Sequence, residues 1–120
     1  MFTFNFEKLD VWQDAIQFAN LIYDSTRNFP ERERFGLTNQ MRRAAISISS
    51  NIAEGSSRAS RTDFARFTEI AAGSLFELLS QAKIAMNQQF LSEVDYKQIS
   101  SAAEKQCRML SGLRRSLVRD

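Results

Sequence analysis

The amino-acid sequence predicts an all-α protein: an up-and-down antiparallel four-helix bundle built as a single domain, residues 1–120. Apolar residues recur at spacings of three and four through four long segments, which is the period of an amphipathic helix. The chain contains only one Pro and four Gly, fewer turn residues than a β-sandwich or barrel would need. The connections between the four segments are about ten, seven and three residues long, so consecutive helices should be antiparallel neighbours.

The first predicted helix covers about residues 9–26 and carries two apolar stripes side by side. We expect one stripe to face the core, namely Leu9, Trp12, Ile16, Ala19 and Tyr23. The other stripe consists of Val11, Ala15, Phe18 and Ile22. Because one core does not need both stripes, we predict that Val11, Phe18 and Ile22 contact a second copy of the chain.

The second predicted helix covers about residues 37–54 and follows a connection in which Phe29 precedes Pro30. Its many Ala and Ser residues would allow close approach to a neighbouring helix. Gly55 is predicted to end the helix in the left-handed conformation. A polar stripe lies apart from the apolar face and could bind a polar ligand, although such stripes more often tie two helices together; it contains Arg43, Ser47, Ser50 and Glu54.

The third and fourth predicted helices cover about residues 62–89 and 93–118. Each begins at a capping box with Asp in place of the usual Glu, Ser60 with Asp63 and Ser92 with Asp95.

Two residues of these helices stand out from the core pattern. Phe76 should point away from the core, either as a scattered surface residue or as part of a contact with another chain. In the fourth helix, an unbroken alternation of three and four runs from Tyr96 to Leu117, and Gln106 is its only polar member.

The residue types that catalysis and metal binding most often use are missing. The chain has no His and one Cys, so Ser–His and Cys–His nucleophiles and the usual zinc sites are excluded. The four Gly residues are too far apart for a phosphate loop. We therefore predict no enzyme activity, no catalytic residue, no cofactor and no metal. Glu77 is expected to pair with an Arg of the second helix, and Cys107 to pack as a small apolar residue.

The expected cellular compartment also follows from features that the sequence lacks. No apolar run is long enough to cross a membrane. No secretory signal is recognisable, and the lone Cys cannot form an internal disulfide. We expect a cytoplasmic protein that does not associate with membranes.

Basic residues are concentrated in two parts of the chain. Residues 27–66 hold eight Arg against four acids, and residues 105–119 hold five basic residues and no acid. A basic surface attracts the phosphates of RNA or DNA, and the candidate contacts are Arg58, Arg61, Arg66, Arg108 and Arg115. The alternative is a solvated face, or cations that offset a helix dipole.

The run RRAAISISSNIAEG, residues 42–55, strongly resembles the signature of the four-helix bundle family, also called the 23S rRNA-intervening-sequence protein family. Further matches are LDVWQDAIQFA (9–19), FPERERFGLTNQMRRA (29–44) and AAGSLFELLSQ (71–81), so the resemblance covers most of the chain. One departure is the pair Ser49-Ser50, where many relatives have a Pro.

The resemblance implies a bacterial cytoplasmic protein that forms a homopentameric ring and has no enzyme activity. A related branch contains accessory proteins of diversity-generating retroelements, which bind nucleic acid and a reverse transcriptase. Seven positions match the family motif and are interpreted as determinants of fold and assembly, without a ligand site: Arg42, Arg43, Asn51, Glu54, Gly73, Ser74 and Glu77.

Two functions are therefore compatible with the sequence. The first is a non-enzymatic homo-oligomeric scaffold or interaction protein, with a pentamer favoured. The alternative is an accessory protein that contacts RNA or DNA phosphates through its basic patches, with a protein partner such as a reverse transcriptase.

Overall fold

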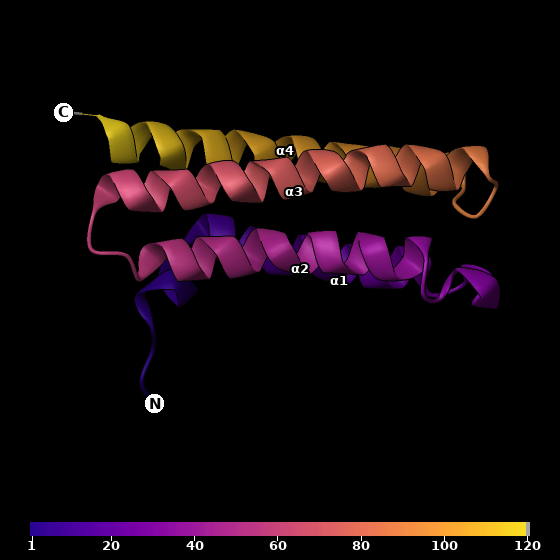
Figure 1. The fold of residues 1–120 in the computed structure, drawn as a ribbon, viewed down its shortest axis with the longest axis horizontal. Coiled ribbons are helices and arrows are strands. Elements are labelled where there is room, and N and C mark those ends of the chain that lie inside the picture. Colours follow the sequence, from indigo (N-terminus) through magenta and orange to yellow (C-terminus); the bar gives the residue numbers. More distant parts are fainter. Residues whose placement is uncertain (120) are drawn as a thin grey trace.

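The computed structural model describes residues 1–119 and consists of four long helices in an antiparallel bundle (Figure 1), which confirms the predicted fold. The helices are α1 (Asp10–Thr26), α2 (Leu37–Ser56), α3 (Arg61–Asn87) and α4 (Glu93–Val118). Two short 3-10 turns precede α1 and α2, namely η1 (Asn5–Lys8) and η2 (Glu31–Glu33).

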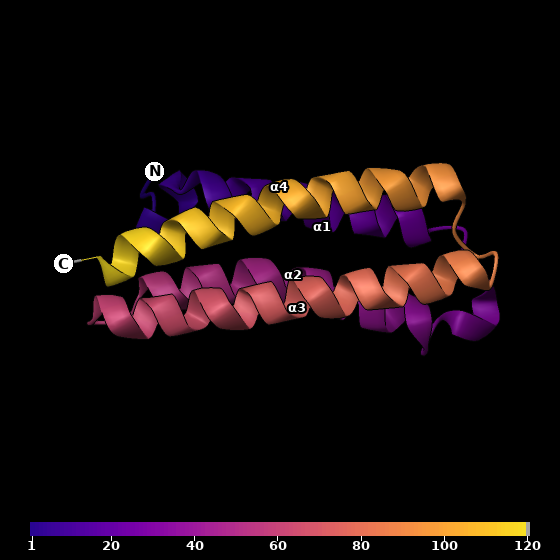
Figure 2. The same ribbon diagram turned by 90° about the horizontal axis from the view of Figure 1, so that it is seen from above.

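The four helices form two layers. Each helix packs against its neighbours in the order α1, α2, α3, α4, and α4 closes the bundle against α1. Figures 1 and 2 show α3 and α4 side by side in one layer, with α1 and α2 in the other. The turn η1 packs on α1 and α2, so the start of the chain belongs to the second layer.

The predicted starts of α3 and α4 are confirmed by their caps. The Ser60 hydroxyl accepts a hydrogen bond from the Asp63 backbone N–H at 3.0 Å, and Ser92 accepts one from Asp95 at 3.0 Å. Each bond satisfies a backbone donor that the first helical turn would otherwise leave unpaired.

The prediction that Gly55 ends α2 in the left-handed conformation is wrong. The helix continues to Ser56, and none of the glycines has a positive φ. Gly55 is needed for space, because a Cβ atom there would lie 2.7 Å from Phe67 Cβ and 2.8 Å from Phe64 Cδ1 on α3. The glycine therefore lets α3 approach α2 closely.

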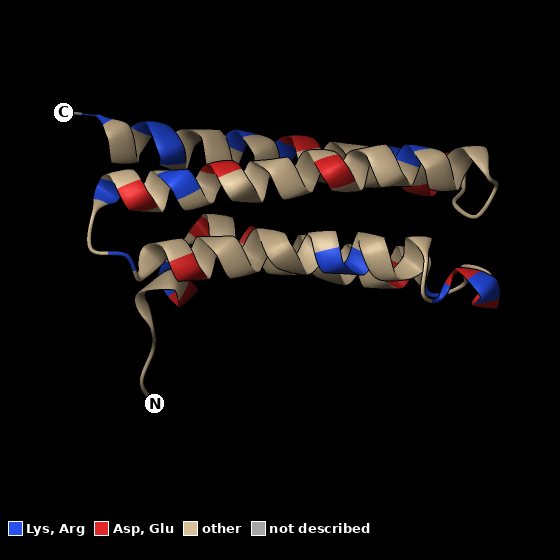
Figure 3. Ribbon diagram, in the orientation of Figure 1, with Lys and Arg blue, Asp and Glu red and all other residues tan. Residues whose placement is uncertain are grey.

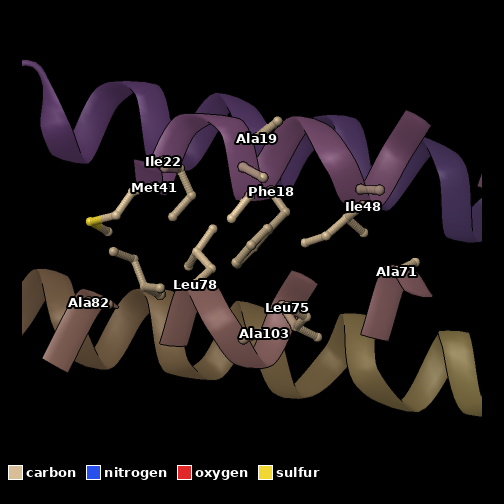
Figure 4. Close-up of a cluster of buried hydrophobic side chains, with 14 of the residues drawn as sticks. Phe18, Ala19, Ile22, Met41, Ile48, Ala71, Leu75, Leu78, Ala82 and Ala103 are labelled. Atoms are coloured by element: carbon tan, nitrogen blue, oxygen red, sulfur yellow. The ribbon is translucent and has the colours of Figure 1, made fainter. Parts of the chain in front are cut away.

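The stripe of α1 that was predicted to contact a second copy is the more deeply buried of the two, and the stripe predicted to face the core is only partly buried. Val11, Phe18 and Ile22 are only 6%, 3% and 0% exposed, and Figure 4 shows Phe18 and Ile22 pointing into the space between the layers. The prediction that these three side chains form surplus apolar surface for a second copy is wrong. Of the stripe expected in the core, Ala19 is buried, whereas Tyr23 is exposed.

Packing against α2 and α4 selects the buried stripe, and the side-chain chemistry of Trp12 and Tyr23 is compatible with this arrangement. Trp12 and Tyr23 each combine an apolar ring with a polar atom and tolerate a place at the edge of the core. Trp12 lies edge-on against Phe6 of η1, with ring centroids 5.1 Å apart, and the Arg42 guanidinium lies 4.6 Å from the Tyr23 ring centre. Phe18 and Ile22 have no polar atom, so burial favours them.

Gln106 is a fully buried polar residue of the α4 seam, as its position predicted. Its Nε2 donates to Asp14 Oδ2 at 2.6 Å and to the Val11 carbonyl at 3.3 Å, which joins α4 to α1. Lys105 Nζ lies 3.2 Å from the other oxygen of the same Asp14 carboxylate. This polar cluster favours one register between the two helices.

We expect Gly55→Ala to lower the free energy of unfolding by about 1–3 kcal/mol, because the added methyl group overlaps with α3. The matched control is Gly73→Ala, since a Cβ at Gly73 meets no atom within 4 Å. That variant should gain about 0.5–1 kcal/mol, because alanine is the better helix former. Urea unfolding at one fixed protein concentration measures both, and a gain in stability for Gly55→Ala would contradict the close approach.

Candidate functional site

Arg42 holds the end of α1 against α2. Its Nε donates to Thr26 Oγ1 at 2.9 Å, and its Nη2 donates to the Tyr23 carbonyl at 3.4 Å. Thr26 in turn donates to the Ile22 carbonyl at 2.8 Å and is 1% exposed. A cation at the C-terminal end of a helix offsets its dipole and satisfies free carbonyl groups. The role of Arg42 inside the chain is therefore structural.

The polar stripe of α2 connects this helix with α3. Ser47 Oγ and Ser74 Oγ lie 2.9 Å apart and share a hydrogen bond. Asn51 Nδ2 donates to both the carbonyl and the hydroxyl of Ser47, at 2.8 Å and 3.0 Å. The other members of the stripe, Arg43, Ser50 and Glu54, are exposed. The stripe thus ties two helices together through Ser47.

Glu77 and Gly73 lie exposed on α3. The prediction that Glu77 pairs with an arginine of α2 is wrong, because its Oε1 accepts a hydrogen bond from Gln81 Nε2 at 3.2 Å and takes part in no ion pair within residues 1–119. Gly73 has open space around its Cα. Neither residue has a packing role inside its own chain that explains its identity.

The predicted basic contacts gather largely at one end of the bundle, where the α2–α3 connection meets the end of α4 (Figure 3). Arg61 reaches across to α4, where its guanidinium donates to the carbonyls of Ser116 and, at 3.2 Å, Leu117. Because α4 ends there, Arg61 caps the helix from a neighbouring element. Its charge is thus partly used within the fold.

Arg58 and Arg66 lie against the same aromatic ring. Both guanidinium carbons are 4.7 Å from the centre of the Phe67 ring, which is 6% exposed. Arg58 also pairs with Glu54 at 2.9 Å, and Arg66 with Asp63 at 3.0 Å. These contacts cover the edge of the core with cations. They leave Phe67 no free face for stacking on a base.

The basic residues of α4 differ in how far their charges are paired. Arg108 pairs with Glu104 at 2.7 Å, one turn away. Arg114, which the set of predicted contacts omitted, pairs with Glu69 of α3 at 2.7 Å. Within residues 1–119, Arg115 forms no ion pair and donates one hydrogen bond of 3.3 Å to the Ser111 hydroxyl. Of the five predicted residues, Arg61 and Arg115 pair with no acid within residues 1–119, and Arg61 instead binds the carbonyls at the end of α4.

An apolar groove runs along the outer side of the α3–α4 layer; we call it the α3–α4 groove. It comprises two adjoining hollows of about 360 and 200 Å³ that share Phe76, Cys107 and Ser111. Its walls include Leu79 and Ala103, and the pairs Glu69–Arg114 and Glu104–Arg108 line its rim. Phe76 is 59% exposed beside the half-buried Cys107. An exposed aromatic ring next to a hollow of this kind is typical of a contact surface.

Groups of acidic residues and cysteine that could hold a metal ion do not occur within residues 1–119. None of the helices of the described chain combines the length and apolarity that a membrane crossing needs.

Two exposed apolar features were not predicted from the sequence. The groove needs residues from two helices, such as Leu79, Ala103 and Cys107, and each of them fits an ordinary core pattern on its own. The second feature is Phe2 and Phe4, which are 76% and 59% exposed. The alternation of Phe with polar residues in MFTFNF was a signal that could have revealed them.

The fold and this surface define a helical-bundle protein with an exposed apolar groove and a basic end. The chain belongs to the family of 23S rRNA-intervening sequence proteins, whose model matches residues 7–112. It is also similar in fold to a crystal structure of a Bacteroides thetaiotaomicron protein of unknown function from the S23 ribosomal protein family. That likeness has a TM-score of 0.77 and 23% identity, and it covers 87% of this chain and 97% of the other. No curated protein is significantly similar to the chain.

We expect Arg42→Met to lower the free energy of unfolding by about 1.5–3 kcal/mol, because it removes charge-assisted hydrogen bonds and leaves Thr26 and Tyr23 partly unsatisfied. Arg43→Met is the matched control: its side chain is exposed, and the change should stay within about 0.5 kcal/mol. Thermal and urea unfolding of the two variants would show the difference. Equal stabilities would mean that Arg42 does not hold α1 against α2.

Proposed function

We propose that this protein is a non-enzymatic helical-bundle scaffold of the cytoplasm that associates with further copies of itself through the α3–α4 groove. The observation that carries the proposal is the groove itself, with Phe76 largely exposed beside Leu79, Ala103 and Cys107. Burial of such an apolar surface between two chains removes it from water, which favours association. A pentameric ring is the form that we favour.

The surroundings of the groove support a protein contact. The apolar centre lies between two ion pairs at its rim, Glu69–Arg114 and Glu104–Arg108, which resembles the apolar core and polar rim of protein interfaces. Gly73 and Ile70 also lie exposed on α3, although a mid-helix glycine is unfavourable by about 1 kcal/mol relative to alanine. Its own chain gives no packing reason for this glycine.

The proposal that the protein is not an enzyme rests on residue chemistry. The groove presents Ser, Cys, Glu and Arg side chains, but its two acids are paired with arginines and the chain contains no histidine to activate a hydroxyl or thiol. The surface offers contact area rather than a nucleophile with its base.

We expect Phe76→Ser to weaken self-association at least about tenfold, since it removes the main apolar side chain of the groove. Phe35→Ser is the matched control, because Phe35 is 84% exposed and lies far from the groove on the connection before α2. Light scattering and sedimentation at micromolar concentration measure the assembly, and circular dichroism checks the helices. A wild-type protein that stays monomeric at these concentrations would refute self-association.

Contact with nucleic-acid phosphates is a second candidate function, favoured by the gathering of arginines at one end of the bundle. Because Arg58, Arg61 and Arg66 all have partners within the fold, we assign the larger part of any such contact to Arg115 and the last turn of α4. An oligomer would repeat this end in every copy and strengthen weak contacts by avidity.

We expect Arg115→Gln to weaken RNA or DNA binding and to reduce the slope of log affinity against log salt by about one. Arg43→Gln is the control, because Arg43 is exposed on α2 away from this end. Fluorescence anisotropy of labelled oligonucleotides at low and moderate salt provides the measurement. An absence of binding at low salt excludes this function, and binding that is insensitive to salt argues against phosphate contacts.

A further inference from the structure

The aromatic rings of the first residues contact one another in a row that leads away from the bundle. Phe6 contacts Trp12, Phe4 stacks on Phe6 with ring centroids 6.0 Å apart, and Phe2 lies edge-on to Phe4 at 4.8 Å. Residues 1–4, which we call the N-terminal arm, precede η1 and belong to no helix. Phe2 and Phe4 remain 76% and 59% exposed.

The base of the arm is fixed, so its direction is defined. The Phe4 backbone N–H donates to Glu7 Oε2 at 2.7 Å, and Gln13 Nε2 donates to the Glu7 carbonyl at 2.8 Å. The first hydrogen bond joins the arm to η1, and the second joins η1 to the first turn of α1. Figure 1 shows the arm turning away from the layer of α3 and α4.

The arm cannot reach the α3–α4 groove of its own chain. It starts on the layer of α1 and α2, whereas the groove lies on the outer side of the opposite layer. Four extended residues span at most about 14 Å, and the molecule measures 47 × 31 × 20 Å. One chain therefore has an exposed apolar arm on one side and an apolar groove on the other.

We propose that Phe2 and Phe4 of the N-terminal arm occupy the α3–α4 groove of a second copy of this chain. The inference rests on the proposed self-association and names the segment that fills the groove. Both elements are apolar and exposed, and the groove presents Phe76, an aromatic partner that can pack edge-on against an incoming phenylalanine. A single aromatic anchor in a pocket can carry much of an interface's binding energy.

The arrangement of arm and groove fixes the kind of symmetry. Because they lie on opposite layers, arm and groove form a head-to-tail contact, in which different surfaces of the two copies meet. Such contacts close into a ring when the rotation between copies allows it.

The native Cys107 provides a direct test, because it lies in the groove and is the only cysteine of the chain. Phe2→Cys, Thr3→Cys and Phe4→Cys are made separately, and each protein is mildly oxidised. A disulfide needs Cβ atoms about 3.5–4.5 Å apart, so at least one variant should give a ladder of covalent oligomers on a non-reducing gel. The same variant with Cys107→Ser should stop at the dimer, because each chain then has one thiol.

Two controls separate a specific contact from random collision. Asn28→Cys places an exposed thiol on the connection between α1 and α2, far from the arm, and should give no ladder. The second control is the double variant Phe2→Ser/Phe4→Ser. It should weaken assembly at least about tenfold in light scattering, the same effect that we expect for Phe76→Ser, and it should keep its helicity.

Failure of this inference differs from failure of the proposed function. If Phe76→Ser abolishes assembly while the arm variants assemble normally and none of the three cysteines forms a ladder, the groove binds another part of the second copy and the arm proposal is wrong. A wild-type protein that is monomeric at micromolar concentration overturns both proposals. A ladder that depends on Cys107 supports both.

Discussion

The close approach of α2 to α3 is the constraint on which the other features of this bundle depend. Gly55 leaves room for Phe64 and Phe67 of α3, so these side chains pack directly against the backbone of α2 at that point. With the backbones this close, Ser47 and Ser74 share a hydrogen bond. The buried Phe67 ring, in turn, provides the surface on which Arg58 and Arg66 lie. Small residues in α2 thus determine where the aromatic rings and the charges of α3 lie.

The same bundle uses much of its positive charge internally. Arg42 and Arg61 each bind carbonyl groups at the end of a neighbouring helix, and Arg58 and Arg66 pair with acids beside Phe67. The number of arginines in the sequence is therefore larger than the number whose charge remains available to a partner. The basic end keeps Arg115 without a paired acid among the described residues, which is why nucleic acid ranks below self-association among the proposed functions.

The apolar surface is divided between two sides of the chain. The α3–α4 groove and the N-terminal arm each expose phenylalanine rings, and neither can cover the other within one molecule. Exposed apolar area on opposite layers favours association in which each copy both gives and receives a contact. The proposed contact with a neighbouring chain would account for Gly73 and Phe76, which are both exposed in their own chain.

The sequence by itself determined the four helices, their order and the caps at Ser60 and Ser92. It also determined that Gln106 is buried and that Phe76 points outward. These features could be predicted because periodicity and capping are local properties of the chain. It could not decide which stripe of α1 is buried, since both have the same spacing. Only packing against α2 and α4 selected Val11, Phe18 and Ile22, whereas Trp12 and Tyr23 could remain at the edge. Tertiary structure also decided the role of Gly55, the partner of Glu77 and the existence of the groove, because each depends on a residue from another helix or on a contact that spacing alone does not specify.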